Sequence, residues 1–482
     1  MNTSTTMSAS EIADKEYKVI PILAAFLISG FIGLFSETAL NIALNTLIDV
    51  FNTNAATVQW LTTGYLLTLG ILVPVSGLLQ QWFTTRQLFI TSLIFSIIGT
   101  IIAAVAPSFE VLMVARVFQA IGTALLLPLM FNTILLIIPP EKRGGAMGMV
   151  GLVIMFAPAV GPTFSGLVLE NLSWHWIFWL CLPFLGIGLV AGILYMENVS
   201  QLTKPKIDIL SIALSTIGFG GIVFGFSSAG EGSEGWGSPK VVGCLIIGVI
   251  SLILFCWRQL KMEQPMINLR AFRYPMFTLG AVLIFICFMV IMSSMLLLPM
   301  YLQGGLMLTA FMAGLTLLPG GVINGLMSPF MGRFFDRYGP RWLVIPGLII
   351  IAIVLWFLSN VSTTTTMTVI VLLHIFLMVG IAMVMMPAQT NGLNQLPKQY
   401  YPSGTAIINT LQQVSGAIGT AVSVSIMSSG QHEYLVNVKD PANPIHIPAA
   451  LSAGVQDGFI YVLAVVVLAL VYAFFIKRVK IN

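Results

Sequence analysis

The sequence predicts an all-α polytopic membrane protein with fourteen transmembrane helices, built as two six-helix bundles plus two extra central helices. Three observations lead to this fold class. The 482 residues are 57% hydrophobic and only 8% charged, whereas soluble domains carry roughly 25% charged residues. Apolar segments of bilayer length, about 20 residues, recur without a large hydrophilic block between them. All but three of the 21 Lys and Arg residues fall on one side of the resulting topology.

The apolar segments are bounded by charges, Pro or Gly. Because a backbone in lipid must satisfy its own hydrogen bonds, we expect each segment to be a helix; the alternating pattern of a membrane barrel is absent. The first segment is too long for a cleavable signal, and acids precede it. The fourteen expected helices cover residues 19–48, 57–80, 88–106, 110–138, 146–169, 176–196, 207–228, 240–257, 275–301, 308–331, 342–359, 366–388, 403–429 and 457–476.

The distribution of Lys and Arg predicts the orientation. Basic residues favour the cytoplasmic loops, which places the N-terminus (1–18) and the C-terminal tail (477–482) in the cytoplasm. The three exceptions are Lys240 and Lys439 on the outside and Arg116 within a helix. The 430–456 segment is then expected to be an extracellular loop, since its three prolines limit helix continuation.

An internal repeat divides the chain. Pro74-x-x-Gly77 followed by Arg86 recurs as Pro329-x-x-Gly332 followed by Arg341, at an offset of 255 residues. Parallel six-helix repeats are typical of transporters, with the substrate site between the halves. The predicted units are the bundles 19–196 and 275–476, with the inserted helix pair 207–257 between them.

A charged turn, GRFFDRYGPR, follows the repeated glycine of the second half. Asp336 can accept a charge-assisted hydrogen bond from Arg333, Arg337 or a neighbouring helix end. Such a contact would hold one conformation and release another. The alternative is that these are solvated loop charges.

These motifs resemble those of a known family. The turn is similar to the G-x-L-x-D-R-x-G-R loop motif of the major facilitator superfamily. LMVARVFQAIG (112–122) and APAVGPTFSG (157–166) resemble the fourth- and fifth-helix motifs of its drug:proton antiporters. ETALNIAL (37–44) and SWHWIF (173–178) resemble first-helix and W-R-W-I-F motifs of the fourteen-helix branch. The resemblance covers most of the chain and implies an EmrB/QacA-like multidrug exporter with the major facilitator fold.

The chain departs from the family pattern at two places. The first-half loop, GLLQQWFTTR, has Gln81 at the Asp position and Thr84 at the second Gly position. In the first helix, the family's Asp position is Ser36 and the acid follows as Glu37. A helix turns about 100° per residue, so this carboxyl is expected to face a different part of the cavity wall.

Glu37 is the principal candidate for proton coupling. It shares a helical stripe of small and polar residues with Gly33 and Asn41, and an ionisable residue within a span is a functional candidate by default. A carboxyl that changes environment between conformations can bind and release a proton. The alternative is a protonated carboxyl that merely hydrogen-bonds a neighbouring helix.

Arg116 is the candidate partner, since both residues are expected in the outer half of the membrane. The alternative is an Arg that snorkels to the surface. The expected substrate-binding residues are Glu37, Asn41, Gln119, Asn409, Gln412 and Gln413. The expected gating residues are Gly77, Pro158, Gly161, Pro162, Gly332, Arg333, Asp336 and Arg337. A purely structural kink is the alternative for Pro158, Gly161 and Pro162, and ordinary interhelical hydrogen bonding is the alternative for Asn409, Gln412 and Gln413.

The predicted function is proton-coupled export of amphipathic or cationic small molecules by alternating access, driven by the proton gradient without a cofactor or metal. A dedicated exporter of one metabolite, peptide, siderophore or nucleotide signal is the alternative. An enzyme would need a nucleophile–base or metal constellation, and the four His and four Cys are scattered. We expect a monomer in a bacterial plasma membrane, with drug-like substrates, protons and lipid as partners and no nucleic acid.

Overall fold

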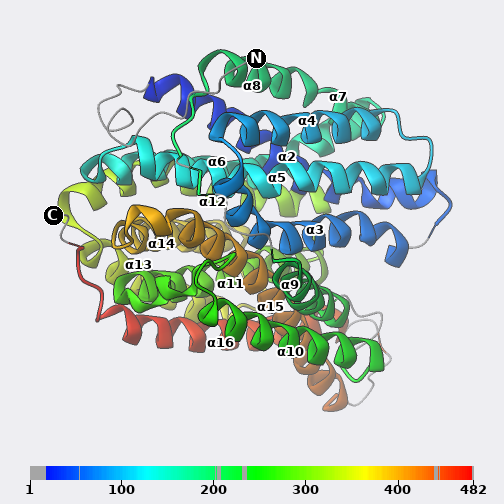
Figure 1. Cartoon of the computed structure of the whole chain (residues 1–482). Coiled ribbons are helices and arrows are strands. Elements are labelled where there is room, and N and C mark those ends of the chain that lie inside the picture. The colour runs from blue at the N-terminus through cyan, green and yellow to red at the C-terminus, as the bar shows by residue number, and fades with distance from the viewer. Residues whose placement is uncertain are drawn as a thin grey trace.

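The structure, a computed structural model, describes residues 18–53, 55–200, 202–203, 208–230, 236–438, 443 and 446–479. The described residues form helices joined by short connections, and none of them lies in a β-strand. The long helices lie side by side along a common direction (Figure 1). The predicted all-α fold class is confirmed.

The helices form two bundles and a separate pair. The first bundle contains α2 (Val19–Val50), α3 (Ala55–Trp82), α4 (Thr85–Ala104), α5 (Phe109–Ile137), α6 (Arg143–Asn171), α7 (His175–Trp179) and α8 (Leu182–Tyr195). The second contains α11 (Pro275–Met300), α12 (Ala310–Tyr338), α13 (Arg341–Leu358), α14 (Met367–Asn394), α15 (Tyr401–Val436) and α16 (Ile447–Ala473). The inserted pair is α9 (Ile209–Gly230) and α10 (Pro239–Lys261). Single-turn helices occur at η1 (Pro140–Lys142), η2 (Leu269–Arg273), η3 (Tyr301–Gly305) and η4 (Lys398–Tyr400).

Local chemistry explains several helix boundaries. The Thr84 side chain and Gln87 form a reciprocal capping box at the start of α4, which satisfies amides that have no helical partner. α12 ends at Gly339, whose φ of 82° lies in the left-handed region that glycine adopts without steric cost. The expected sixth helix is divided into α7 and α8, and Pro183 occupies the first turn of α8, where its missing amide costs little.

Thirteen helical stretches in the described residues are long and apolar enough to cross a membrane. The fourteenth, α15, has 36 residues but is less apolar. It packs against α3, α5, α9, α11, α14 and α16, so neighbouring helices rather than lipid surround much of its surface. A more polar sequence is therefore compatible with its position.

The prediction that 430–456 forms a loop is wrong for most of its length. α15 continues to Val436 and α16 begins at Ile447, which leaves a connection of 437–446. Pro448 lies in the first turn of α16, where proline is tolerated, and so it starts the helix instead of ending one. Most of the connection, like most of the predicted cytoplasmic segment 1–18 and part of the tail 477–482, lies outside the described residues.

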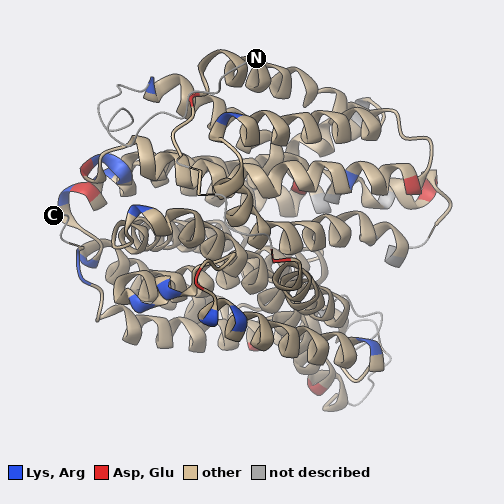
Figure 2. Cartoon of the chain, in the orientation of Figure 1, with Lys and Arg blue, Asp and Glu red and all other residues tan. Residues whose placement is uncertain are grey.

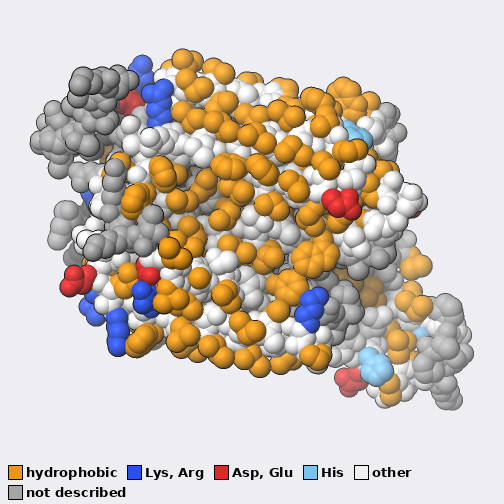
Figure 3. Space-filling model, turned by 45° about the vertical axis from the view of Figure 1, so that its right-hand side comes forward, with side chains coloured by type: hydrophobic (Ala, Val, Ile, Leu, Met, Phe, Trp, Pro, Cys, Tyr) orange, Lys and Arg blue, Asp and Glu red, His pale blue; other side chains and the backbone are white. Residues whose placement is uncertain are grey.

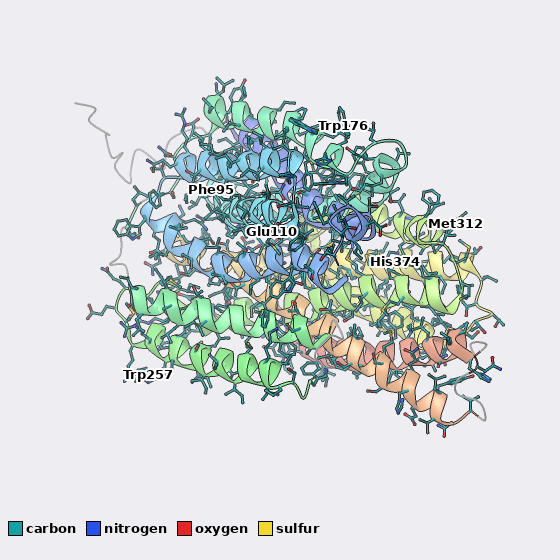
Figure 4. The ribbon with its side chains drawn as sticks, turned by 90° about the vertical axis from the view of Figure 1, so that its right-hand side faces the viewer. Phe95, Glu110, Trp176, Trp257, Met312 and His374 are labelled. Atoms are coloured by element: carbon teal, nitrogen blue, oxygen red, sulfur yellow. The ribbon has the colours of Figure 1, made fainter. Side chains whose placement is uncertain are left out.

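Charge is distributed unequally between the two ends of the bundle. Most Lys and Arg residues lie at one end, here called the basic end (Figure 2). α2 begins and α16 ends at this end (Figures 1 and 2). Hydrophobic side chains cover the flank between the ends (Figure 3), and the exposed rings of Trp176 and Trp257 lie at the periphery (Figure 4). This surface is that of a protein embedded in a bilayer.

The two bundles meet most closely at the basic end. The backbones of Gly332 on α12 and Gly144 on α6 are so close that a methyl group on Gly332 would overlap the Gly144 carbonyl. In the repeat-related contact, a methyl group added to Gly77 of α3 would lie 3.1 Å from the Ala406 side chain of α15. At the other end, methyl groups on Gly166 of α6 or Gly314 of α12 would have no neighbour within 4 Å.

Candidate functional site

Glu37 lies on α2 and is partly buried. Two glycines bring neighbouring helices close to it. A methyl on Gly161 of α6 would lie 2.5 Å from the Thr38 hydroxyl oxygen, and one on Gly33 would lie 3.1 Å from the Thr123 hydroxyl of α5. The carboxyl therefore occupies a stretch of α2 that α5 and α6 approach closely. The Asn41 side chain, predicted on the same stripe, lies outside the described residues.

Arg116 of α5 is completely buried, so the snorkelling interpretation is wrong. Its guanidinium donates hydrogen bonds to the carbonyl oxygens of Ser36 (2.9 Å) and Glu37 (3.5 Å) on α2. It also donates to the Leu61 carbonyl of α3 at 3.2 Å. The predicted proximity to Glu37 is present, but these hydrogen bonds go to its backbone. Arg116 thus fixes the α2 backbone at the position of the acid.

Tyr65 of α3 belongs to the same site and was not identified from the sequence. Its ring centroid lies 4.2 Å from the Arg116 guanidinium carbon, and the side chain is fully buried. Its hydroxyl donates to Thr123 at 2.8 Å and to the Gly33 carbonyl at 3.4 Å. A cation over an aromatic ring is stabilised most when both are desolvated. The only sequence signal is its place on an i, i+4 stripe with Leu61, which many core residues share.

Gln119 supports Arg116 from one turn along α5. Its amide oxygen accepts from the guanidinium at 3.0 Å, and its amide nitrogen donates to Thr100 of α4 at 3.1 Å. Gln119 is buried, and both halves of its amide are therefore engaged within the first bundle. This geometry favours a positioning role over the predicted contact with substrate.

The predicted opposite wall lies on α15. Asn409 is buried and donates to the Thr405 carbonyl of its own helix at 2.8 Å. Gln412 is buried, and its amide nitrogen has no partner among the described residues. Gln413 is partly buried. Because α15 packs against helices of both bundles and the inserted pair, these amides are located at the boundary between the halves.

Asp336 joins the two bundles at the basic end. Its carboxylate accepts hydrogen bonds from the backbone amides of Gly144 (2.8 Å) and Gly145 (2.9 Å), at the first turn of α6. A helix N-terminus favours an anion there. Of the partners predicted for Asp336, the helix end is therefore correct. Arg333 and Arg337 are exposed, and neither forms an ion pair with it among the described contacts.

Arg143, the first residue of α6, adds a second connection between the bundles. It is buried and donates to Asn394 of α14 at 2.8 Å and to the Tyr401 hydroxyl of α15 at 3.1 Å. It also binds the Leu135 and Ile138 carbonyls at the end of α5. In the sequence, Arg143 is only one of the basic loop residues.

The predicted fifth-helix kink residues lie within an unbroken helix. α6 runs continuously through Pro158, Gly161 and Pro162, although the Pro162 side chain is not described. Gly161 packs against α2, and Gly416, 255 residues further along the chain, packs against Met292 and Phe288 of α11. Close helix packing is thus the structural role of both glycines, as small residues provide in membrane bundles.

The remaining ionisable groups of the described residues are dispersed. No group of three His, Cys, Asp or Glu side chains with metal-binding spacing occurs among the described residues. His374 of α14 is buried beside Gly320, with no described partner for its Nδ1. The charged and polar groups that cross between the bundles instead define a two-bundle membrane transporter, with a buried ionisable cluster in one half and interhalf contacts at one end.

Comparisons with known proteins agree with this class. A model of the Major Facilitator Superfamily matches residues 26–420. The lincomycin resistance protein LmrB of Bacillus subtilis strain 168 is 68% identical over 470 residues, covering 98% of both chains. The multidrug export protein EmrB of Haemophilus influenzae is 26% identical over 432 residues, covering 89% of this chain and 84% of that protein.

A solved structure shows the same fold. The proton:xylose symporter XylE aligns with a TM-score of 0.65 and 15% identity over 96% of each chain. The chain belongs to the Major Facilitator Superfamily. It is a membrane transporter and not an enzyme, and the predicted relationship to EmrB-type exporters is confirmed.

Proposed function

We propose that this transporter exports amphipathic or cationic small molecules in exchange for protons, with lincomycin as the first substrate to test. The observation that carries the proposal is Glu37, an acid within the first span whose backbone is held by the buried Arg116. The similarity to a lincomycin resistance protein over nearly the full length of both chains supports the substrate class.

The mechanism follows from competition at one carboxyl. A cationic substrate and a proton both neutralise Glu37, so they bind in alternation. When the site opens outward, protonation displaces the substrate. When it opens inward, loss of the proton restores the carboxylate. Arg116 keeps α2 fixed against α3 and α5 during the exchange, so the acid and its supporting helices move as one unit.

The conformation in the structure suits an outward-opening step. Asp336 and Arg143 hold the bundles together at the basic end, which the distribution of Lys and Arg assigns to the cytoplasm. We place the protein as a monomer in a bacterial plasma membrane, with both termini cytoplasmic. One charge moved across the membrane contributes about 2.3 kcal/mol per 100 mV. Exchange of one proton for a monovalent cation moves no net charge, and the pH gradient alone then drives export.

Everted vesicles provide the test. Lincomycin accumulation, and its competition with a fluorescent cationic dye, should depend on an imposed pH gradient and disappear with an uncoupler. Accumulation unaffected by the uncoupler would exclude proton exchange. A panel of competing compounds of different chemistry separates multidrug export from dedicated export, because a dedicated exporter would transport only one class of compound.

A further inference from the structure

The repeat-related contacts at the basic end are built differently. On one side, Asp336 accepts from the amides of Gly144 and Gly145, the second and third residues of α6. On the other side, the second and third residues of α15 are Pro402 and Ser403. Each pair is contacted by the glycine that precedes the repeated loop motif.

The second contact lacks the carboxylate and one of the two amides of the first. Gln81 stands where the loop motif has an acid, and so no carboxylate is available. Pro402 lies against Gly77 as Gly144 lies against Gly332, and it has no amide hydrogen to donate. The contact of one carboxylate with two amides therefore cannot form on the α3–α15 side, where only the Ser403 amide remains.

The connection that leads into the inserted pair binds Gln81 instead. The backbone amide of Thr203 donates to the Gln81 carbonyl at 3.2 Å. The Thr203 hydroxyl donates to the Gln81 side-chain oxygen, also at 3.2 Å. The end of α3, in the first bundle, is thereby attached to the segment that precedes α9.

The connection that leaves the inserted pair binds Ser403. The amide of Asn268 donates to the buried Ser403 hydroxyl at 3.0 Å. Its neighbour Ile267 donates to the Gln259 side chain of α10 at 3.1 Å, and Gln259 in turn donates to Ser211 of α9 at 2.6 Å. The start of α15, in the second bundle, is thereby attached to both inserted helices.

The inserted pair also spans the boundary between the bundles. α9 packs against α3 and against α15. At its end away from the basic end, Trp236 donates to Ser425 of α15. At the basic end, Asp208 and Arg258 hold α9 and α10 together through two hydrogen bonds of 2.6 and 3.0 Å.

We propose that Gln81 and Ser403 are positioning residues through which the inserted helix pair closes the α3–α15 side of the basic end. In this arrangement, the hydrogen bonds donated by Thr203 to Gln81 and by Asn268 to Ser403 take the place of a direct contact between an acid and two amides. The inference rests on the proposed alternating access, because it holds that the inserted pair stabilises the closed conformation relative to the open one. Loss of these contacts shifts the population toward opening at the basic end.

Spin-label distances test the proposal directly. Labels at Phe83, at the end of α3, and at Gln399, just before α15, are placed in the full chain after replacement of its four native cysteines. Both sites are exposed. The variant carrying Thr203→Val and Ser403→Ala should show a larger fraction of long distances between the labels. Thr278→Val is the matched control, because the described hydrogen bonds of its hydroxyl go to the Phe272 and Tyr274 carbonyls, in the connection just before its own helix α11.

A rescue variant separates positioning from general damage. Adding Gln81→Asp and Pro402→Ala to the double variant rebuilds an acid opposite two amides, and the short distance should return. A distance distribution in the double variant equal to that of wild type would overturn the proposal, as would an equal shift in Thr278→Val. The readout needs no substrate, so it remains decisive even if the vesicle experiments reject proton-coupled export.

Discussion

At the scale of single residues, the site is organised around a buried guanidinium. Arg116 donates to carbonyls on α2 and α3 and lies over the Tyr65 ring. The guanidinium donates its hydrogen bonds to backbone carbonyl oxygens of the neighbouring helices. The Glu37 carboxyl therefore remains available for a proton or a substrate. The Glu37 carboxyl can change its protonation state while its backbone is held in place.

Replacing Glu37 by Gln should abolish uphill export of cationic substrates while binding of neutral substrates persists. The amide keeps the shape of the side chain but cannot exchange a proton. Transport in everted vesicles and equilibrium binding measure the two effects. Glu110→Gln is the control, since this acid is exposed at the start of α5. Proton-driven accumulation by the Glu37 variant would show that the carboxyl is only a structural hydrogen-bonding group.

Arg116→Lys should destabilise the protein more than Tyr65→Phe. A lysine cannot reach three helices at once, and each buried carbonyl left without a donor costs about 1–3 kcal/mol. Tyr65→Phe keeps the ring beneath the cation and loses the hydroxyl bonds, a cost of about 1 kcal/mol. Thermal unfolding in detergent ranks the two variants, and the reverse order would contradict the support role given to Arg116.

At the scale of helices, glycines decide where elements approach. Gly332 and Gly144 bring α12 and α6 into backbone contact. A methyl group on the repeat-related Gly77 would instead lie 3.1 Å from the Ala406 side chain and 3.4 Å from the Pro402 carbonyl oxygen. At the basic end, the helices therefore approach more closely on the α12–α6 side than on the α3–α15 side. This asymmetry matches the presence of an acid on one side only.

Gly332→Ala should open the basic end, while Gly77→Ala should be tolerated. The methyl at Gly332 would overlap backbone that cannot move aside, an overpacking cost of about 1–3 kcal/mol or more. At Gly77 the neighbouring methyl is 3.1 Å away, and a small shift relieves it. Labelling of a cysteine at the buried Thr405 from the cytoplasmic side reports opening. Equal labelling in the two variants would refute the predicted asymmetry.

The inserted pair is held by an ion pair whose pH dependence lies outside the physiological range. The hydrogen bonds from Arg258, and then Ser211, lower the pKa of Asp208 to about 2. A lowered carboxyl pKa stabilises the fold above the unfolded value of about 4, and this contribution is lost as the pH falls toward about 2. Asp208→Asn should therefore lower the unfolding temperature by the same amount at pH 5 and pH 8. A difference that grows within that interval would contradict the assignment.

At the scale of the whole molecule, the close contacts between the bundles extend from the basic end toward the middle. Glycines of α12 lie close to α6 from Gly332 to Gly321, whereas a methyl group on Gly314 would have no neighbour within 4 Å. If the basic end is cytoplasmic, these closing contacts lie on the cytoplasmic side. Helix count, orientation and conformation are thus linked in one testable arrangement.

A cysteine at Asn443 should react with an impermeant reagent added to intact cells, and one at Gln399 should not. Asn443 lies in the connection between α15 and α16, and Gln399 lies before α15 at the basic end; both positions are exposed. The positive-inside rule assigns them to opposite sides. Labelling of the cysteine at Gln399 but not of the one at Asn443 would show that the topology is inverted. Labelling of both would require a different helix count.

Most helical spans, the repeat and the family could be predicted from the sequence, because they depend on composition, spacing and motifs that a chain carries locally. It also singled out Glu37, since an acid in an apolar run is costly wherever the run folds. Tertiary structure decided which groups meet. The sequence offered Asp336 three partners, two arginines and a helix end, and only the packing of α12 on α6 selected the Gly144 and Gly145 amides. Tyr65 had no distinguishing pattern until α3 and α5 brought it beneath Arg116. The roles of Thr203 and Ser403 likewise depend on hydrogen bonds between segments more than one hundred residues apart, and no local pattern encodes such a distance.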